Sequence, residues 1–366
     1  MKKSTAILTA AAISALLANT ALASEKVPVR KVFEDNGGTV TYNSTNNTVD
    51  IDYLDSKINI VIGGDTVNFN GGDIKADTEL INGRTVIDSE SLEKIMKSAE
   101  ALDSVEEIKL NLGKVLVYDF GSMKLHSYIS NDALYDVSYL VEKGDNLVIV
   151  ESSAFKANIE EWNEYIKSLK KNVAGQLMAY HPNGADFYGD YDIYATGNAV
   201  DSWGENGSIK VLTDGFVTSF GDAVEEKMPQ NIKLIETGDK INIGGIDFNI
   251  IEAGDDAYSI EIPEINCVYR HMMGSKCHNI IPSLEYIDAE IETLESYEGK
   301  GYTLILTSHY DPEGQGAIAE KIDYMTKTKQ IAEKCSNADE FIDEMKKTFS
   351  GYTGDNYLEM TAQMLY

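Results

Sequence analysis

The chain has 366 residues, of which 43% are hydrophobic, and 60 acidic residues outnumber 31 basic ones to give a formal charge of −29. A chain of this length and apolar content can bury a core and is typical of about two domains. Wholesale disorder is therefore excluded. A nucleic-acid groove is excluded as well, because phosphate binding requires clustered lysines and arginines, and an anionic membrane surface is disfavoured for the same reason.

The first segment has the pattern of an export signal. Lys2 and Lys3 precede a small, apolar stretch over residues 6–17, and Ala21-Leu22-Ala23 follows. A basic start, a short hydrophobic region and an Ala-x-Ala end are typical of a bacterial secretory signal peptide. The alternative, a membrane anchor, needs about 20 apolar residues, and this run is shorter. We expect residues 1–23 to be cleaved and the mature protein to be secreted or associated with the cell envelope, without a membrane span.

Residues 28–98 predict a small α+β module. Alternating apolar and polar residues over 39–42 and 48–52 flank a turn-rich segment, which indicates a β-hairpin. Ser89 stands at the N-cap position of a helix that we expect to reach Ala99, with apolar residues on one face.

This module resembles the copper amine oxidase N-terminal-like domain. The resemblance depends on the hairpin motif at 37–42 and on the strand entry Asn82-Gly83-Arg84-Thr85. The segment contains no histidine and no cysteine, so it has no side chains suited to copper. We interpret residues 24–104 as an envelope or accessory module.

From residue 105 to residue 366, short strands alternate with helices, which predicts a layered α/β domain. One helix is expected over 158–169, with its apolar residues in a single stripe. Near the C-terminus, Ser336-Asn337-Ala338-Asp339 reads as a capping box that opens a helix with Phe341 and Met345 facing the core.

Three polar segments at strand ends indicate where chemistry could occur in this domain. A strand over 146–151 ends in Glu151, a loop from His181 to Gly189 follows a later strand, and a strand from Leu304 leads to His309. This order of motifs resembles the metallo-β-lactamase superfamily across residues 120–366. The resemblance implies an α/β fold in which an αβ/βα sandwich follows the small α+β module.

The resemblance also implies a metal site, because the superfamily motif places imidazoles and carboxylates on loops at one edge of the sandwich. Such ligands hold zinc or iron, which converts a bound water into a nucleophile. The ligand pattern is altered in this chain. His181 keeps the first histidine of the loop, but Asn183, Ala185 and Asp186 replace the later His, Asp and His. Glu151 stands where the family has Asp, and the expected Gly-His turn falls at 254–256, which contain no histidine.

The candidate metal ligands are therefore His181, Asp186, His271 and His309, of which His271 takes the place of a bridging carboxylate and His309 that of the last family histidine. His278 is a further candidate ligand, and Asp186 and Glu151 are the candidate catalytic groups. Zinc or iron is the expected cofactor.

Two functions remain open at this point, and with them whether the protein is an enzyme. The first is a hydrolase-like protein with one metal, acting on an ester, lactone or phosphoester as a small-molecule substrate. The second is a catalytically inactive protein of the same fold that binds a ligand or is associated with the cell envelope. Structural roles are the alternative to metal ligation for these histidines. His181 could cap a strand end, His309 could form a hydrogen bond with a carbonyl, and His126 is expected to be structural.

Overall fold

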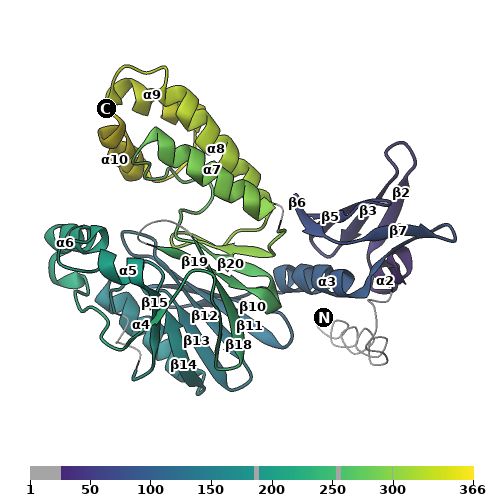
Figure 1. Cartoon of the computed structure of the whole chain (residues 1–366), viewed down its shortest axis with the longest axis horizontal. Helices are drawn as coiled ribbons and strands as arrows, with labels where there is room; N and C mark the ends of the chain where they lie inside the picture. The colour runs from purple at the N-terminus through teal and green to yellow at the C-terminus, as the bar shows by residue number, and fades with distance from the viewer. Residues whose placement is uncertain (1–25, 185–188, 253–256, 299) are drawn as a thin grey trace. The chain divides into compact units, whose positions relative to one another are not determined.

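The computed structural model describes residues 26–184, 189–252, 257–298 and 300–366, so the predicted signal peptide lies outside the described residues. The chain divides into two compact units (Figure 1). Unit 1 is Met1–Asp103 with Glu298–Gly301, and unit 2 is Ser104–Tyr297 with Tyr302–Tyr366. None of the described helices is both long enough and apolar enough to cross a membrane.

The described residues of unit 1 form two antiparallel sheets and two helices. One sheet has the strand order β2-β3-β4-β5-β6 and the other β1-β8-β7. The elements are β1 (Lys26–Pro28), α2 (Val29–Asp35), β2 (Thr39–Asn43), β3 (Thr48–Tyr53), β4 (Ser56–Val61), β5 (Thr66–Phe69), β6 (Gly72–Lys75), β7 (Thr78–Ile81), β8 (Arg84–Asp88) and α3 (Ser89–Asp103).

The predicted hairpin is present in unit 1, and the predicted helix start is shifted by one residue. Strands β2 and β3 pair antiparallel with Thr39 opposite Asp52. The side chain of Asp88, and not that of Ser89, accepts a hydrogen bond at the start of α3, from the backbone N–H of Ser91 at 2.8 Å. Asp and Ser are both good N-cap residues, so the local sequence does not choose between them.

Unit 2 is built on two sheets. The larger has the order β16-β15-β14-β13-β12-β11-β10-β9, and the smaller has the order β17-β18-β19-β20-β21. The larger sheet consists of β9 (Glu106–Lys109), β10 (Gly113–Asp119), β11 (Met123–Ser130), β12 (Val137–Lys143), β13 (Asn146–Val150), β14 (Asn172–Leu177), β15 (Ile193–Thr196) and β16 (Ile232–Ile235). The smaller consists of β17 (Lys240–Ile243), β18 (Ile246–Glu252), β19 (Tyr258–Ile262), β20 (Cys267–Tyr269) and β21 (Leu304–Leu306).

Helices lie between and after these strands. They are α4 (Lys156–Ser168), α5 (Gly197–Ser202), α6 (Ser208–Phe220), α7 (Leu284–Glu298), α8 (Gly316–Ala332), α9 (Ala338–Thr348) and α10 (Asp355–Leu365), with short 3-10 turns η2 (Gly221–Ala223) and η3 (Pro263–Ile265). In α9, Asn337 is the N-cap and accepts the backbone N–H of Glu340, one residue later than predicted. The Glu340 carboxylate accepts the backbone N–H of Ser336, the residue before the cap.

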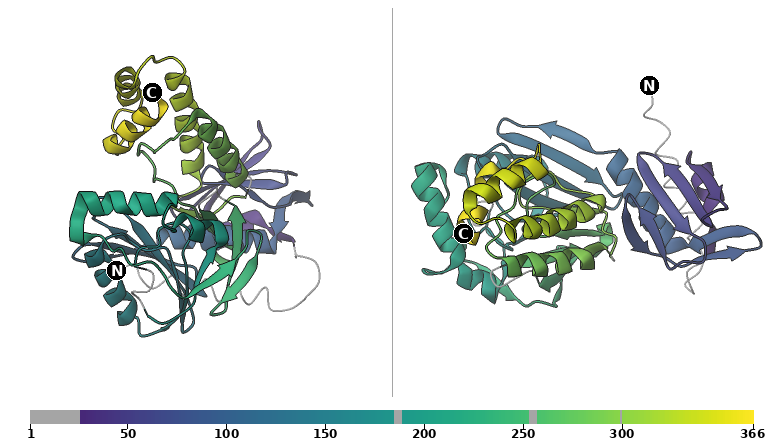
Figure 2. Two further views of the ribbon diagram at one scale, coloured as in Figure 1. Left: turned by 60° about the vertical axis from the view of Figure 1, so that its left-hand side comes forward. Right: turned by 90° about the horizontal axis from the view of Figure 1, so that it is seen from above.

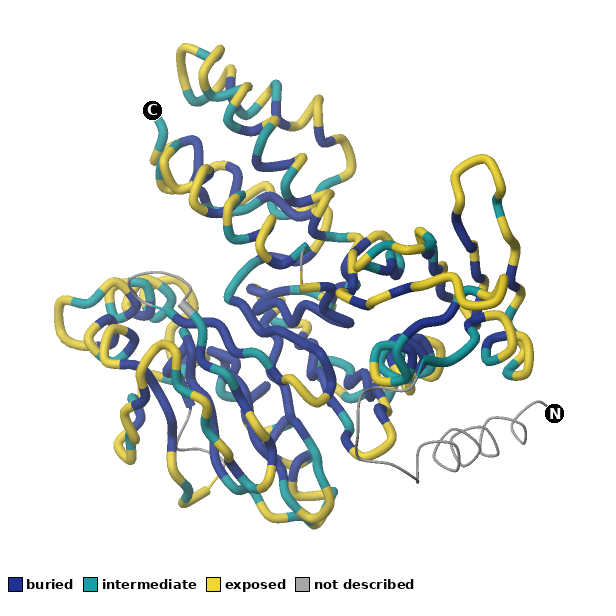
Figure 3. Tube along the Cα trace, turned by 45° about the vertical axis from the view of Figure 1, so that its right-hand side comes forward, coloured by how far each residue is buried: buried dark blue, intermediate teal, exposed yellow. Residues whose placement is uncertain are grey.

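Successive side chains of a strand point to opposite faces of its sheet, and their packing arranges unit 2 in four layers. On β12, Leu140 packs with Trp162 of α4 on the outside of the larger sheet. The neighbouring Tyr139 points the other way and meets Tyr269 of β20 edge-on, with ring centroids 6.0 Å apart. On the far side of the smaller sheet, Val268 packs against α7 and α8. The expected αβ/βα sandwich is therefore confirmed, and Figures 2 and 3 show its buried strands and the helices that cover them.

Candidate metal centre

Three of the five histidines of the chain meet at one edge of unit 2. His181, His271 and His309 each present a ring nitrogen, and these nitrogens lie within 4.8 Å of one another. The ring centroids are 4.9 Å apart for His181 and His271, 5.5 Å for His181 and His309, and 5.4 Å for His271 and His309. The predicted convergence of these three side chains is thus present in the structure.

Parallel strand pairs explain why the histidines converge. β13 and β14 run parallel, and so do β20 and β21, so within each pair both carboxyl ends reach the same sheet edge. His181 follows β14, while His271 and His309 follow β20 and β21. Backbone bridges pair His309 with Asp136 and with Met273, which joins the two sheets at this edge.

The ring geometry suits a metal ion. The three imidazole planes are inclined to one another by 71° to 82°. In a tetrahedral zinc site with Zn–N bonds of about 2.0–2.1 Å, the nitrogens would be about 3.3 Å apart, so modest side-chain rotations would bring them to bonding positions. His271 Nε2 is buried and has no hydrogen-bond partner among the described residues, which is costly unless another group binds it.

His309 is oriented by two acceptors. Its Nδ1 donates to the carbonyl oxygen of Leu134 at 3.0 Å and lies 3.3 Å from Asp136 Oδ1. A proton on Nδ1 leaves Nε2 unprotonated and available as a ligand. Asp136 is itself buried, and its Oδ2 accepts the backbone N–H of Ala154 at 2.9 Å. This carboxylate was not among the residues expected from the sequence, because only the fold brings it to His309.

Glu151 holds the loop that carries His181. Its Oε1 accepts the backbone N–H groups of Ala179 and Tyr180 at 2.6 and 2.7 Å, and its Oε2 accepts that of His181 at 3.0 Å. The same Oε2 lies 3.6 Å from His181 Nδ1. Since the side chain is fully buried and bonded on both oxygens, this geometry supports a positioning role in place of the catalytic role expected for Glu151.

Burial and neighbouring charges shift the pKa values of the two histidines and the carboxylate in different directions. Burial lowers the pKa of His271 well below its ordinary value, and the other two histidines lower it further. Burial alone would lower the pKa of His181, but Glu151 and Asp136 outweigh it and the pKa is raised. Burial would raise the pKa of Asp136, but the two neighbouring histidines hold it below its ordinary value. His271 is therefore neutral at pH 7, whereas at His181 protons would compete with a metal ion.

The other predicted positions fall elsewhere. Asp186, expected both as a ligand and as a catalytic group, lies outside the described residues, as does the turn at 254–256. The amide of Asn183 donates to the carbonyl of Glu225, so it ties down its loop. His278 contacts the Tyr324 hydroxyl at 3.2 Å and is not part of the histidine group.

His126 also lies outside this group, in the larger sheet. It is buried, and its Nδ1 lies 2.8 Å from the Tyr165 hydroxyl. Its Nε2 is 3.4 Å from a carboxylate oxygen of Glu142. These contacts agree with the structural role expected for it.

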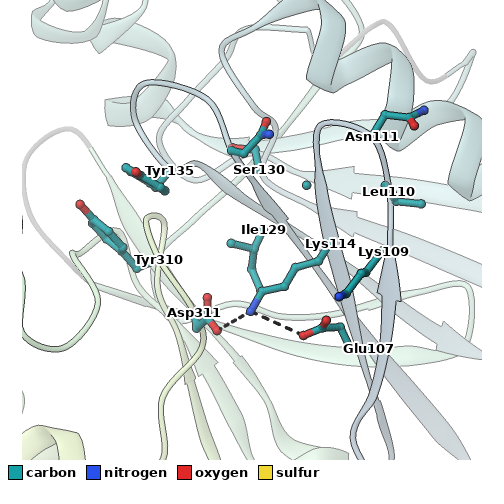
Figure 4. A pocket seen from close by; sticks show the side chains of 12 residues that line it. Glu107, Lys109, Leu110, Asn111, Lys114, Ile129, Ser130, Tyr135, Tyr310 and Asp311 are labelled. Atoms are coloured by element: carbon teal, nitrogen blue, oxygen red, sulfur yellow. Dashed lines mark hydrogen bonds and ion pairs between the residues drawn. The ribbon is translucent and has the colours of Figure 1, made fainter.

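A shallow hollow of about 480 Å³ adjoins the segments around His309 (Figure 4). Tyr135 and Tyr310 stack on one side of it, with ring centroids 4.9 Å apart and backbone φ angles of 55° and 66°. Lys114 forms ion pairs with Asp311 at 2.9 Å and with Glu107 at 4.0 Å. The hollow therefore has an aromatic wall, and the charge of Lys114 is balanced.

Comparisons with known proteins give one family match and several structural similarities. Residues 25–105 match the family model of the copper amine oxidase N-terminal domain. No curated protein sequence matches the chain.

Among solved structures, a beta-lactamase domain protein from Burkholderia ambifaria is 13% identical, with a TM-score of 0.49 over 68% of this chain and 86% of its own. A metallo-beta-lactamase from Pontibacter korlensis is 13% identical, with a TM-score of 0.40 over 61% and 99%. A double mutant of the sec-alkyl sulfatase PisA1 is 12% identical, with a TM-score of 0.47 over 75% and 51%. Residues 25–105 are thus similar to the copper amine oxidase N-terminal domain, and they precede an α/β unit in which two sheets pack between helices.

Proposed function

We propose that the mature chain is an exported hydrolase with one metal ion, which acts on an ester, lactone or phosphoester. The observation that carries this proposal is the convergence of His181, His271 and His309. Three protein ligands and one open position are the composition of a catalytic zinc site, whereas structural sites are closed by four. Within the part of the chain that the structure describes, no second group of this kind was found, which favours one ion.

The protein groups have separate tasks in this proposal. The three histidines hold the ion, Asp136 orients His309, and Glu151 fixes the backbone before His181. A bound zinc or iron ion would lower the pKa of a coordinated water to about 7 and polarise the substrate oxygen. In ester hydrolysis, the water oxygen bonds to the acyl carbon and the carbon–oxygen bond to the leaving group breaks. One water proton goes to the leaving alkoxide and the acid product releases another to solvent.

The decisive experiment combines metal analysis with turnover. Purified protein loaded with zinc or iron should hold one ion per chain and hydrolyse at least one of 4-nitrophenyl butyrate, a γ-lactone or 4-nitrophenyl phosphate. His181→Ala, His271→Ala and His309→Ala should each lose the ion and the activity. His278→Gln, which changes a histidine outside the group, is the matched control and should keep both. Absence of metal from the wild-type protein would contradict the proposal.

A second function is supported by two substitutions in the expected metal loop. Asn183 donates to a carbonyl, and the methyl group of Ala185 cannot ligate a metal. On this alternative the protein binds a ligand of the cell envelope without turnover. Stoichiometric metal with no hydrolysis of any ester, lactone or phosphoester would favour it over the hydrolase.

Export has its own test. If residues 1–23 are a signal peptide, the protein recovered outside the cytoplasm of a bacterial host should begin at Ser24. N-terminal sequencing of that material checks this directly. An intact Met1 on the exported protein would contradict cleavage.

A further inference from the structure

A cavity of about 570 Å³ reaches the metal centre at His271 and Tyr180. Its volume lies in the range of about 300–1,000 Å³ that small-molecule sites occupy. The rings of Tyr180 and His271 stack with centroids 3.5 Å apart. The end of the cavity that these rings line therefore lies at the candidate metal centre. A ligand in the cavity would therefore have one end beside the three histidines.

Methionines from three parts of unit 2 line the cavity. Met272 and Met273 precede α7, Met325 lies in α8, and Met364 lies in α10. Figures 1 and 2 show α7, α8 and α10, coloured green to yellow, beside one another. Met273 and Met325 are 7% and 4% exposed, whereas Met364 is 49% exposed, so the lining runs from a buried interior to the surface. Methionine is flexible and polarisable, and such walls adapt to apolar ligands.

The cations of the lining are neutralised. Arg270 pairs with Glu290, and both side chains are buried. Lys321 lies 3.1 Å from a carboxylate oxygen of Glu313 and donates to the carbonyl of Met273 at 2.6 Å. With both positive charges paired, the cavity favours a neutral, apolar group over an anionic one.

We propose that this cavity binds the unbranched aliphatic chain of the substrate, so that the enzyme hydrolyses carboxylic esters of medium-chain acids. The assignment rests on the hydrolase function proposed above and adds the substrate class. The ester group lies at the histidines and the acyl chain extends toward Met364. Hydrolysis releases the fatty acid and the alcohol, with the atoms exchanged as described above.

Binding can be tested without turnover. In metal-stripped protein, the apolar fluorescent probe N-phenyl-1-naphthylamine should bind, and n-alcohols from butanol to decanol should displace it. Each added methylene should tighten binding by up to about fourfold. Ala289→Trp adds bulk from an exposed cavity-lining position on α7 and should weaken decanol binding at least tenfold. Glu295→Trp, exposed on the same helix but outside the lining, is the control and should bind as wild type.

Turnover then separates the two proposals. In metal-loaded protein, kcat/KM for 4-nitrophenyl esters should rise from acetate to decanoate. Ala289→Trp should abolish this rise, and Glu295→Trp should keep it. Two results would overturn the proposal of an aliphatic substrate and leave the proposal of a hydrolase intact. One is hydrolysis whose kcat/KM does not depend on chain length, and the other is the same dependence of kcat/KM on chain length in Ala289→Trp and Glu295→Trp. Chain-dependent binding with no turnover of any ester, lactone or phosphoester would show that the cavity binds an aliphatic ligand, and it would overturn both the ester substrate and the hydrolase.

Discussion

Replacing Glu151 with Gln tests how the loop before His181 is held. The two side chains have the same shape and differ in charge and in one hydrogen-bonding atom. In the wild type, the carboxylate accepts three backbone N–H groups, those of residues 179 to 181. The amide oxygen of Gln can replace Oε1, but its NH₂ group then faces the N–H of His181, which is left without an acceptor.

The structure sets the size of the effect. Losing one buried hydrogen bond to a charged acceptor costs about 1.5–3 kcal/mol, and the two remaining bonds weaken because the acceptor is now neutral. We expect Glu151→Gln to lower the free energy of unfolding by about 2–4 kcal/mol, which for a unit of this size lowers Tm by about 5–15 °C. Zinc affinity should fall about 10- to 100-fold, because a group that positions a ligand is lost.

Thermal unfolding followed by circular dichroism measures the first effect, and titration calorimetry with zinc measures the second. Glu160→Gln is the matched control, since Glu160 is exposed on α4 and its change should leave both quantities unaltered. Substitution of an exposed residue should change Tm by less than about 2 °C. If Glu151→Gln melts within that margin of the wild type and binds zinc equally well, the positioning role of Glu151 is refuted.

Three further predictions concern other parts of unit 2. Asp136→Asn should lower zinc affinity about 10- to 100-fold in calorimetry, because it loses the negative charge beside His309 Nδ1; an unchanged affinity would remove Asp136 from the site. Burial lowers the pKa of His126 from 6.5 to about 4, so the unfolded chain takes up its proton first as the pH falls. This contribution to stability is complete above pH 6.5 and decreases by up to about 3 kcal/mol by pH 4, and urea unfolding of His126→Gln should lack this part of the pH dependence. Asn337→Ala removes the acceptor for the Glu340 N–H and should cost about 1 kcal/mol in the same assay; no loss would show that the cap is dispensable.

The helix caps show how far local sequence carries a prediction. Both helices were expected near their observed positions, yet both observed caps lie one residue away from the predicted ones, at Asp88 instead of Ser89 and at Asn337 instead of Ser336. Neighbouring Ser, Asp and Asn residues all accept the required hydrogen bond. Which of them does so depends on the backbone angles where the chain enters the helix, and packing sets those angles.

In the candidate metal centre, too, the sequence predicted some residues and the fold decided the others. The resemblance of the strand-end motifs to the metallo-β-lactamase superfamily predicted His181, Asp186, His271 and His309 as ligands. The three histidines meet in the structure because strands that run parallel bring their ends to one edge. Asp136 left no such signal, since it becomes a partner of His309 only when the two sheets pack. Glu151 was recognised as a residue of the site, but its role depends on backbone N–H groups that a sequence pattern does not display.

By itself, the sequence determined the class of each segment: an acidic chain, a small α+β module and a layered α/β unit. These follow from composition and from hydrophobic periodicity, which are local properties. The tertiary structure alone decided which carboxylates serve the histidines, and that a methionine-lined cavity ends at His271. Such contacts join residues far apart in the chain, and their distances depend on how the sheets and the covering helices pack against one another.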